Sequence, residues 1–197
     1  IGLVVSNSFM SRHRLSHDDL VFDVLETGRL SRIRIFCTHG RLDVYCIHLH
    51  HGCRIEREKT IRTLSTCIAP KELVHSWVCG DFNYVVDQHD RIDLATLNST
   101  GIGDLVEAAL YDKEVWNIHG FHDLLLEDFT WSRGTSTSRL DRIYSNHHIV
   151  EQLHHDFFCI RLTPRHFLSD HFPVRGGKHR IVDATRLRRI PKWMTSD

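Results

Sequence analysis

The sequence predicts an α/β domain, and three observations lead to this prediction. The chain has 197 residues, 41% of them hydrophobic, which is enough to bury one sizeable core. Strand-like stretches, in which apolar residues alternate with polar ones or run together, occupy residues 29–37, 42–49 and 74–79. Amphipathic helix patterns occupy residues 54–69 and 103–110. A chain in which strands and helices follow one another is expected to pack helices against a sheet.

The first half of the chain is expected to be rich in strands. The apolar residues 1–5 predict one strand. Residues 38–41 form a plausible turn between the next two strands, which are therefore expected to pair as an antiparallel hairpin. Because side chains alternate along a strand, His48 would lie on one face of the second hairpin strand and Tyr45 on the other.

The buried strand at residues 74–79 leads into Gly80-Asp81-Phe82-Asn83, where Gly80 gives the backbone freedom to turn. An extended backbone would place Asp81 and Asn83 on one side and turn Phe82 toward the core. A carboxylate acceptor would then stand beside an amide donor. Gly, Asp and Asn are also common in ordinary turns, so this string alone fits either a functional site or a simple strand end.

The later segments are shorter. Residues 121–126 are expected to form a short helix and residues 129–132 a short strand, and residues 140–144 and 157–162 predict two more strands. Residues 176–197 carry Lys and Arg in excess over Asp and show no apolar period. We therefore expect a domain at residues 1–175 followed by a basic tail or linker at residues 176–197.

Composition limits the classes of partner and compartment. Lys plus Arg equals Asp plus Glu at 25 each, so any affinity for nucleic acid must come from a local basic patch. The six cysteines form no C-x-x-C pair, which indicates free thiols in a reducing compartment. No apolar run has the length of a membrane span. We expect an intracellular protein, nuclear or cytoplasmic, that is monomeric and shows no sign of a protein partner.

Three strings contain the residues best suited to chemistry: Gly80-Asp81-Phe82-Asn83, Ser138-Arg139-Leu140-Asp141-Arg142-Ile143-Tyr144 and Ser169-Asp170-His171-Phe172-Pro173-Val174. In this order they resemble the C-terminal signature of the endonuclease/exonuclease/phosphatase superfamily, which includes deoxyribonuclease-like enzymes, abasic-site endonucleases and the endonuclease domains of non-LTR retrotransposons. The resemblance covers residues 1–174. It implies a two-sheet β-sandwich flanked by helices in four layers.

The resemblance also implies roles for individual residues. Asp141 would orient His171, and His171 would act as a general base or hold the scissile phosphate. Asp81 would position or deprotonate the attacking water, and Asn83 would donate a hydrogen bond to a phosphoryl oxygen. Asp170 would be a metal carboxylate. The metal would be Mg2+, or else Mn2+, because Mg2+ takes one or two carboxylates and completes its octahedron with water and phosphate.

One further site residue is expected upstream, where the superfamily has a histidine or a tyrosine at the end of a strand. His48 resembles the histidine form and Tyr45 the tyrosine form, and the polar residues that follow His48 favour it. A zinc site is the alternative for this segment, because His48, His50, His51 and Cys53 are close in sequence. Their spacing matches no known structural zinc finger.

The sequence departs from the superfamily in its N-terminal part. An asparagine motif and a Gln-Glu motif, whose glutamate would be the second metal carboxylate, are not found, and Glu26 is the only glutamate before His48. We therefore expect an N-terminally truncated domain that lacks the first two strands and the helix between them. The leading hypothesis is a Mg2+-dependent phosphodiesterase, a DNA endonuclease domain of retroelement type with DNA as its partner.

Two alternatives remain. One is a catalytically inactive relic or interaction module of the same fold, and the other is a lipid or inositol phosphoesterase. A basic groove beside Asp81 and His171 would favour DNA, whereas an apolar rim would favour a lipid.

Overall fold

The computed structural model describes residues 2–38, 40–100, 102–124, 126, 128–146, 158–162 and 169–178. Their main feature is a six-stranded sheet in the order β1-β2-β3-β4-β10-β7. The strands are β1 (Leu20–Glu26), β2 (Leu30–Cys37), β3 (Gly40–His48), β4 (His75–Asp81), β7 (His122–Asp123) and β10 (Asp141–Ser145). Of the neighbouring pairs, β3 and β4 are parallel and the others antiparallel. The parallel pair is joined by the crossover helix α2 (Arg54–Cys67).

A second sheet of four short strands has the order β6-β5-β9-β8. Its strands are β5 (Arg91–Asp93), β6 (Asn98–Ser99), β8 (Trp131–Arg133) and β9 (Ser136–Ser138). A separate hairpin pairs β11 (Phe158–Leu162) with β12 (Val174–Lys178). Two sheets with helices confirm the predicted α/β sandwich class.

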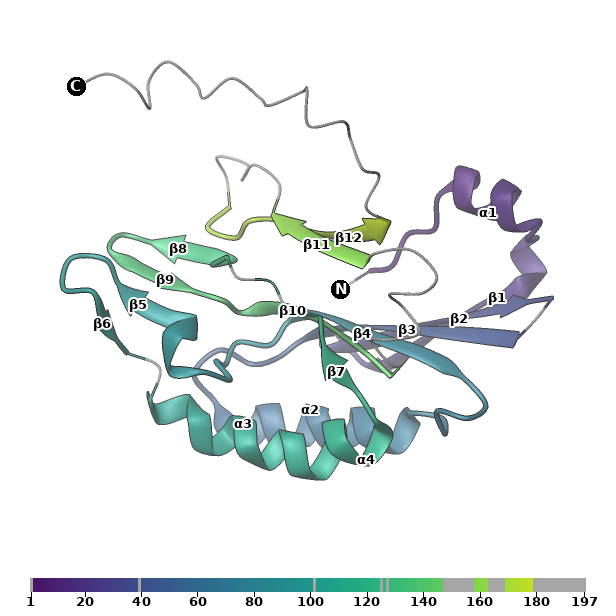
Figure 1. The fold of residues 1–197 in the computed structure, drawn as a ribbon. Helices are drawn as coiled ribbons and strands as arrows, with labels where there is room; N and C mark the ends of the chain where they lie inside the picture. The colour runs from purple at the N-terminus through teal and green to yellow at the C-terminus, as the bar shows by residue number, and fades with distance from the viewer. Residues whose placement is uncertain are drawn as a thin grey trace, which may run out of the picture.

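Helices cover one face of the six-stranded sheet, as Figure 1 shows for α2, α3 and α4. α3 (Leu105–Tyr111) runs without a break into a π-helical turn, η4 (Asp112–Trp116), and then into α4 (Asn117–His119). The shorter elements are α1 (Asn7–His13) and the 3-10 turns η1 (His17–Asp19), η2 (Gln88–Asp90) and η3 (Ile102–Asp104). In the described residues no helix is both long and apolar enough to cross a membrane.

The main core lies between this helix layer and the sheet. Tyr45, Val78 and Tyr144 contribute from β3, β4 and β10, and each is at most 3% exposed. Trp116 stacks on the Tyr144 ring with centroids 4.2 Å apart. The sheet residues that alternate with these therefore point to the opposite face, away from the helices.

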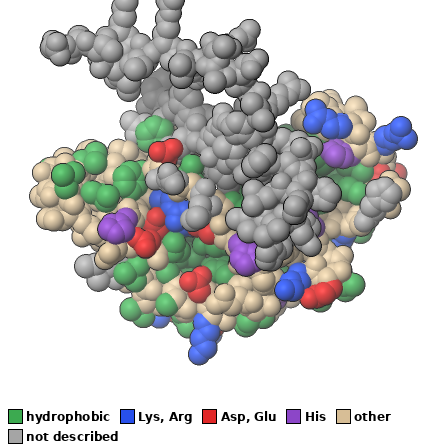
Figure 2. Space-filling view, in the orientation of Figure 1, with side chains coloured by type: hydrophobic (Ala, Val, Ile, Leu, Met, Phe, Trp, Pro, Cys, Tyr) green, Lys and Arg blue, Asp and Glu red, His purple; other side chains and the backbone are tan. Residues whose placement is uncertain are grey.

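On the surface in Figure 2, acidic and basic side chains are interspersed, as equal numbers of the two would suggest. The described cysteines, Cys37, Cys46, Cys53, Cys67 and Cys79, are free thiols, and Cys37 is exposed.

Several sequence predictions are confirmed. The hairpin at residues 29–49 is β2 paired with β3, the helix at residues 54–69 is α2, and the strand at residues 74–79 is β4. β4 continues through Gly80 to Asp81, so the predicted turn begins later than expected. The predicted start of the tail at residue 176 falls inside β12, which runs to Lys178, and residues 179–197 lie outside the described part of the chain.

Other predictions are wrong. Residues 2–5 form no strand, because a strand needs a hydrogen-bonded neighbour and the described residues offer them none. The expected helix at residues 121–126 is replaced by β7, since Gly120 ends the preceding helix in a left-handed conformation and His122 then pairs with Ser145. β1 was not predicted. It carries apolar residues on both faces and therefore lacks a clear alternation.

Candidate active site

Three polar residues form a row across the sheet on the face away from the helices. In the strand register His48 of β3 lies opposite Asp81 of β4, and Asp81 lies opposite Asp141 of β10. His48 Nε2 is 3.8 Å from Asp81 Oδ2. The row depends on a close approach of β3 and β4, because a Cβ atom on Gly80 would meet the Ile47 carbonyl oxygen at 1.9 Å. Only glycine fits there.

His171 joins this row from the segment at residues 169–174. Its Nδ1 is 2.8 Å from Asp141 Oδ2, and its Nε2 is 3.8 Å from Asp81 Oδ2. A carboxylate that accepts from Nδ1–H leaves Nε2 as the nitrogen that faces Asp81. The structure thus brings together His48, Asp81, Asp141 and His171.

The His171 segment is held by β8. His171 forms an isolated β-bridge with Trp131, and Phe172 N donates to the Thr130 carbonyl oxygen at 2.7 Å. The buried Thr130 hydroxyl also accepts from the backbone N–H groups of Leu140 and Asp141, both at 2.9 Å. Thr130 is therefore connected to both halves of the Asp141–His171 pair.

Asn83 holds Asp81 in place. The Asn83 backbone N–H donates to Asp81 Oδ1 at 2.9 Å, and its side-chain amide donates to Asp81 Oδ2 at 3.0 Å and to the Leu49 carbonyl oxygen at 2.9 Å. The geometry needs a positive φ of 50° at Asn83, a conformation that asparagine tolerates better than most residues. Both amide hydrogens are engaged, so donation to a substrate would require one of these bonds to break.

His48 and Tyr45 have different surroundings. The His48 side chain is about half exposed beside Asp81. Tyr45 is fully buried on the helix side, and its hydroxyl donates to the Cys67 carbonyl oxygen at 2.8 Å. Of the two alternatives, His48 is the one that lies in the row.

The local electrostatics differ from one member of the row to the next. Burial, and then the neighbouring charge of Asp141, raises the pKa of Asp81 to about 6. The hydrogen bond to Asp141 raises the pKa of His171 above its ordinary value. Burial, and then the nearby charge of Arg29, lowers the pKa of His48. Near neutral pH the site therefore combines a carboxylate of weakened acidity with an imidazole that holds its proton more firmly.

A cavity of about 700 Å³ opens beside the row. Asn83, His171, Asp170 and Trp131 line one part of it. Asp170 Oδ2 accepts from the Trp131 indole N–H at 2.9 Å, and this bond lowers the pKa of the Asp170 carboxyl. Four arginines also line the cavity, namely Arg54, Arg57, Arg91 and Arg133.

Carboxylates hold three of these arginines. Arg54 Nε donates to Glu58 Oε1 at 2.8 Å. Arg57 makes a two-bond ion pair with the buried Glu107, at 2.7 and 2.5 Å, and also donates to the His50 carbonyl oxygen. Arg91 is 3.1 Å from Asp104 and also donates to the Ser138 hydroxyl. Asp104 and Asp170 are the acidic lining residues, and Glu58, Glu107 and Asp104 balance the charges of Arg54, Arg57 and Arg91.

No protein-family model matches the sequence, and no curated protein matches it either. Solved structures do match. The endonuclease domain of TRAS1, a telomere-specific non-LTR retrotransposon, is 16% identical with a TM-score of 0.53, and the match covers 81% of this chain and 67% of that one. D. rerio TDP2, complexed with a single-strand DNA product, is 15% identical with a TM-score of 0.50, covering 86% and 81%. This chain has the endonuclease/exonuclease/phosphatase fold.

An endonuclease/exonuclease/phosphatase family protein from Leptotrichia buccalis C-1013-b matches at 17% identity with a TM-score of 0.48. The match covers 77% of this chain and 53% of that chain. At these identities the likeness concerns the fold alone.

In an endonuclease/exonuclease/phosphatase fold a divalent metal is expected beside the row. Among the described residues, no three His, Cys, Asp or Glu side chains gather in a way that could hold a metal ion. Asp170 offers one carboxylate at the cavity, and Mg2+ accepts as few as one when water and phosphate supply its other ligands. The donor set fits a magnesium ion that takes most of its ligands from water and substrate.

Two groups of site residues were missed from the sequence. Thr130 and Trp131 were taken only as part of a short strand, and no local pattern signals that they contact Asp141 and Asp170. The cavity arginines come from segments far apart in the chain, and only the fold brings them to one cavity.

Proposed function

We propose that this chain is a DNA endonuclease domain of retroelement type that hydrolyses phosphodiester bonds with Mg2+. The observation that carries the proposal is the contact of His171 with Asp141 at 2.8 Å, with Asp81 and His48 beside them in one row. A carboxylate-bound imidazole facing a second carboxylate is an arrangement suited to moving a proton at a phosphate.

The proposed reaction assigns a proton task to each residue. Asp81, with a pKa of about 6, takes a proton from the attacking water while that oxygen bonds to phosphorus. His171, kept protonated by Asp141, donates to the phosphoryl oxygen on which negative charge develops. The bond from phosphorus to the leaving oxygen then breaks. His48, in the same row as Asp81, contacts the phosphate. The leaving oxygen takes its proton from solvent water, because the lowered pKa of His48 leaves that imidazole mostly neutral near pH 7.

Asp170 is the proposed metal residue. A bound Mg2+ ion would stabilise negative charge on the phosphate, and the indole N–H of Trp131 would keep Asp170 ionised and oriented toward the cavity.

The arginine-lined cavity supports a polyanionic substrate over a lipid. Arg133, and the donors of Arg54 and Arg91 that their carboxylate partners leave over, are planar groups that match phosphate oxygens, whereas Arg57 is committed to Glu107. These guanidinium groups are the local donors that a chain with no net charge would use to bind nucleic acid. The likeness to the TRAS1 endonuclease domain supports the retroelement type.

A second candidate is an inactive module that binds phosphate without cleaving it. Of the two carboxylates that line the cavity, Asp104 is paired with Arg91. Asp170 by itself would offer few direct ligands, which should weaken magnesium binding and favours this candidate.

The test is nicking of supercoiled plasmid DNA in Mg2+, with EDTA as the negative condition. His171→Ala should lower the nicking rate by about 10²- to 10⁴-fold. His17→Ala, an exposed histidine in η1, is the matched control and should be unchanged. DNA binding without nicking in the wild type would establish the inactive module, and neither binding nor nicking would refute the choice of DNA.

A further inference from the structure

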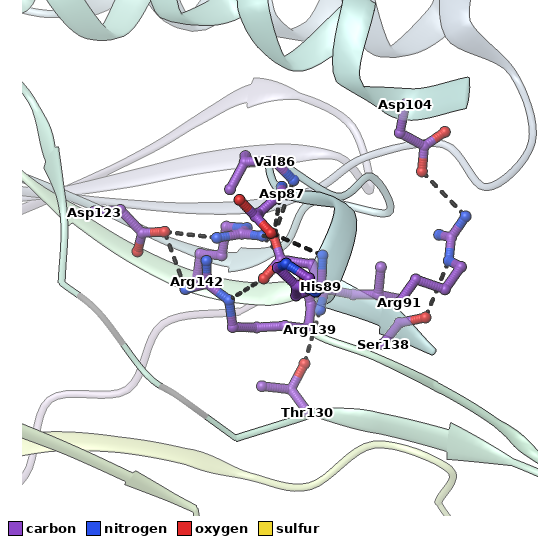
Figure 3. A network of polar contacts seen from close by, with 12 residues as sticks. Val86, Asp87, His89, Arg91, Asp104, Asp123, Thr130, Ser138, Arg139 and Arg142 are labelled. Atoms are coloured by element: carbon purple, nitrogen blue, oxygen red, sulfur yellow. Dashed lines mark hydrogen bonds and ion pairs between the residues drawn. The ribbon is translucent and has the colours of Figure 1, made fainter. Parts of the chain in front are cut away.

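A cluster of four charged side chains, three of them buried and one partly buried, lies close to the site and has no role in the proposed reaction. It contains Asp90, Asp123, Arg139 and Arg142, of which Figure 3 labels the last three. Arg139 Nε donates to Asp90 Oδ1 at 2.7 Å, and its Nη1 donates to Asp123 Oδ2 at 3.2 Å. Arg142 Nη1 donates to Asp123 Oδ2 at 2.6 Å, and its Nη2 donates to Asp90 Oδ2. Each guanidinium bridges both carboxylates. We call these four residues the charge cluster.

Asp90 organises the loop that follows the first site string. Its Oδ2 accepts from the backbone N–H groups of Val86 and Asp87, both at 3.0 Å. Its own carbonyl oxygen accepts from Arg139 N at 2.7 Å. The Asp90 carboxylate therefore holds residues 86–90 of the loop at residues 83–90, and the bond to Arg139 N fastens them to the segment that enters β10.

The loop at residues 83–90 and the segment that enters β10, which Asp90 and Arg139 join, both carry site residues. The loop starts at Asn83, whose three hydrogen bonds hold the Asp81 carboxylate and the Leu49 carbonyl oxygen. Arg139 and Arg142 flank Asp141 in the sequence. Asp81 and Asp141 are like charges opposite each other on neighbouring strands, so their separation must be maintained by the backbone that carries them.

Stability alone is a weak explanation for the charge cluster. The side chains of Arg142, Asp90, Arg139 and Asp123 are 0, 8, 9 and 17% exposed. Apolar side chains of similar volume often stabilise a fold at least as well as such buried ion pairs, whose charges must be removed from water. Burial alone would raise the pKa of Asp90, but the guanidinium groups of Arg142 and Arg139 outweigh it and lower the pKa. Asp90 therefore stays ionised, and its hydrogen bonds to the two guanidinium groups fix the orientation of these side chains as well as their distance.

We propose that Arg139 and Asp90 are positioning residues, which set the loop at residues 83–90 so that Asn83 holds Asp81 at the correct place opposite Asp141. The proposal rests on the proposed function in one respect only, that Asp81 and His171 act on a phosphodiester. Arg139 and Asp90 touch neither substrate nor reacting atoms and act through Asn83.

The kinetic test compares Arg139→Lys with Arg32→Lys in plasmid nicking. Both changes keep the positive charge and remove a guanidinium that donates to a buried or half-buried carboxylate, Asp90 in one case and Asp23 on β1 in the other. At a temperature where both variants are fully folded, we expect Arg139→Lys to lower kcat by about 10- to 100-fold with KM nearly unchanged. Arg32→Lys should leave kcat unchanged. Equal kcat values for the two variants would overturn the proposal.

A double-mutant cycle gives a second kinetic criterion. If Arg139 acts through Asn83, the kcat losses of Arg139→Lys and Asn83→Ala should not multiply, because the second change removes an interaction that the first has already displaced. Multiplicative losses would mean that Arg139 acts elsewhere. Asp90→Asn serves in place of Arg139→Lys if that variant does not fold.

An NMR readout makes the test independent of activity. The side-chain amide of Asn83 gives a pair of 1H–15N signals, assigned by their absence in Asn83→Ala. We expect these signals to shift or broaden in Arg139→Lys and to stay in place in Arg32→Lys. If the wild type fails to cleave DNA, the proposed function is wrong, yet shifted Asn83 signals still support positioning and unmoved signals refute it.

Discussion

Gly80 is the position where one added methyl group tests the architecture of the site most directly. Its φ is 145°, and a Cβ atom there would lie 1.9 Å from the Ile47 carbonyl oxygen on β3. A side chain at such a φ costs about 1–3 kcal/mol. Moving β3 away from β4 adds about 1–3 kcal/mol of overpacking. We therefore expect Gly80→Ala to lower the free energy of unfolding by about 2–6 kcal/mol.

Gly134→Ala is the matched control, because Gly134 has a φ of 61° but nothing within 4 Å of an added Cβ. It should lose about 1 kcal/mol, the conformational part alone. Urea unfolding followed by tryptophan fluorescence measures both variants. With a slope of about 2 kcal/mol/M, the midpoint should fall by about 1–3 M for Gly80→Ala and by about 0.5 M for Gly134→Ala. Equal midpoint shifts would refute the close approach of β3 and β4 as the reason for a glycine at this position.

Three further predictions concern the titrating groups and their partners. Asp81→Asn should stabilise the protein above pH 6. Folding raises the pKa of Asp81 from 3.8 to about 6, so the wild type loses stability as the pH rises through this range, whereas the amide does not titrate. The gain in the free energy of unfolding should be at most about 3 kcal/mol and should vanish in unfolding curves at pH 4. Asp141→Asn should lower the pKa of His171 in an NMR titration of the ring, since the hydrogen bond to Asp141 is the main reason that this pKa is raised, and an unchanged pKa would contradict that cause. Trp131→Phe should raise the pKa of the Asp170 carboxyl by removing the indole N–H, as 13C-detected NMR would report. An unchanged pKa would mean that another donor dominates there.

Local pattern was sufficient wherever neighbouring residues decide the structure. The hairpin of β2 and β3, the helix α2 and the strand β4 follow from alternation, amphipathic spacing and turn residues within each segment. The sequence patterns did not predict β1, because its apolar residues lie on both faces and give no alternation. Phe22 and Val24 are 49 and 62% exposed. The chain at residues 2–5 has the apolar residues of a strand, but pairing is a tertiary event.

The candidate site shows the same division. Three strings in order were enough to nominate Asp81, Asn83, Asp141, Asp170 and His171, and alternation along the strand put His48 and Tyr45 on opposite faces. Which of those faces carries the row could not be known until the helices were seen to cover the other one. The engagement of both Asn83 amide hydrogens was also beyond the sequence, since Leu49 lies 34 residues away.

Local sequence patterns were enough for the order of the main strands and helices, the residue types available for chemistry and the absence of net charge. The register that aligns His48, Asp81 and Asp141, the gathering of four arginines at one cavity and the charge cluster depend on contacts between segments far apart in the chain. Arg57 meets Glu107 across 50 residues, and Arg142 meets Asp90 across 52. Such pairs form when burial of the hydrophobic core brings distant backbone segments together. Because the hydrophobic effect is not directional, no local sequence pattern predicts which distant residues will meet.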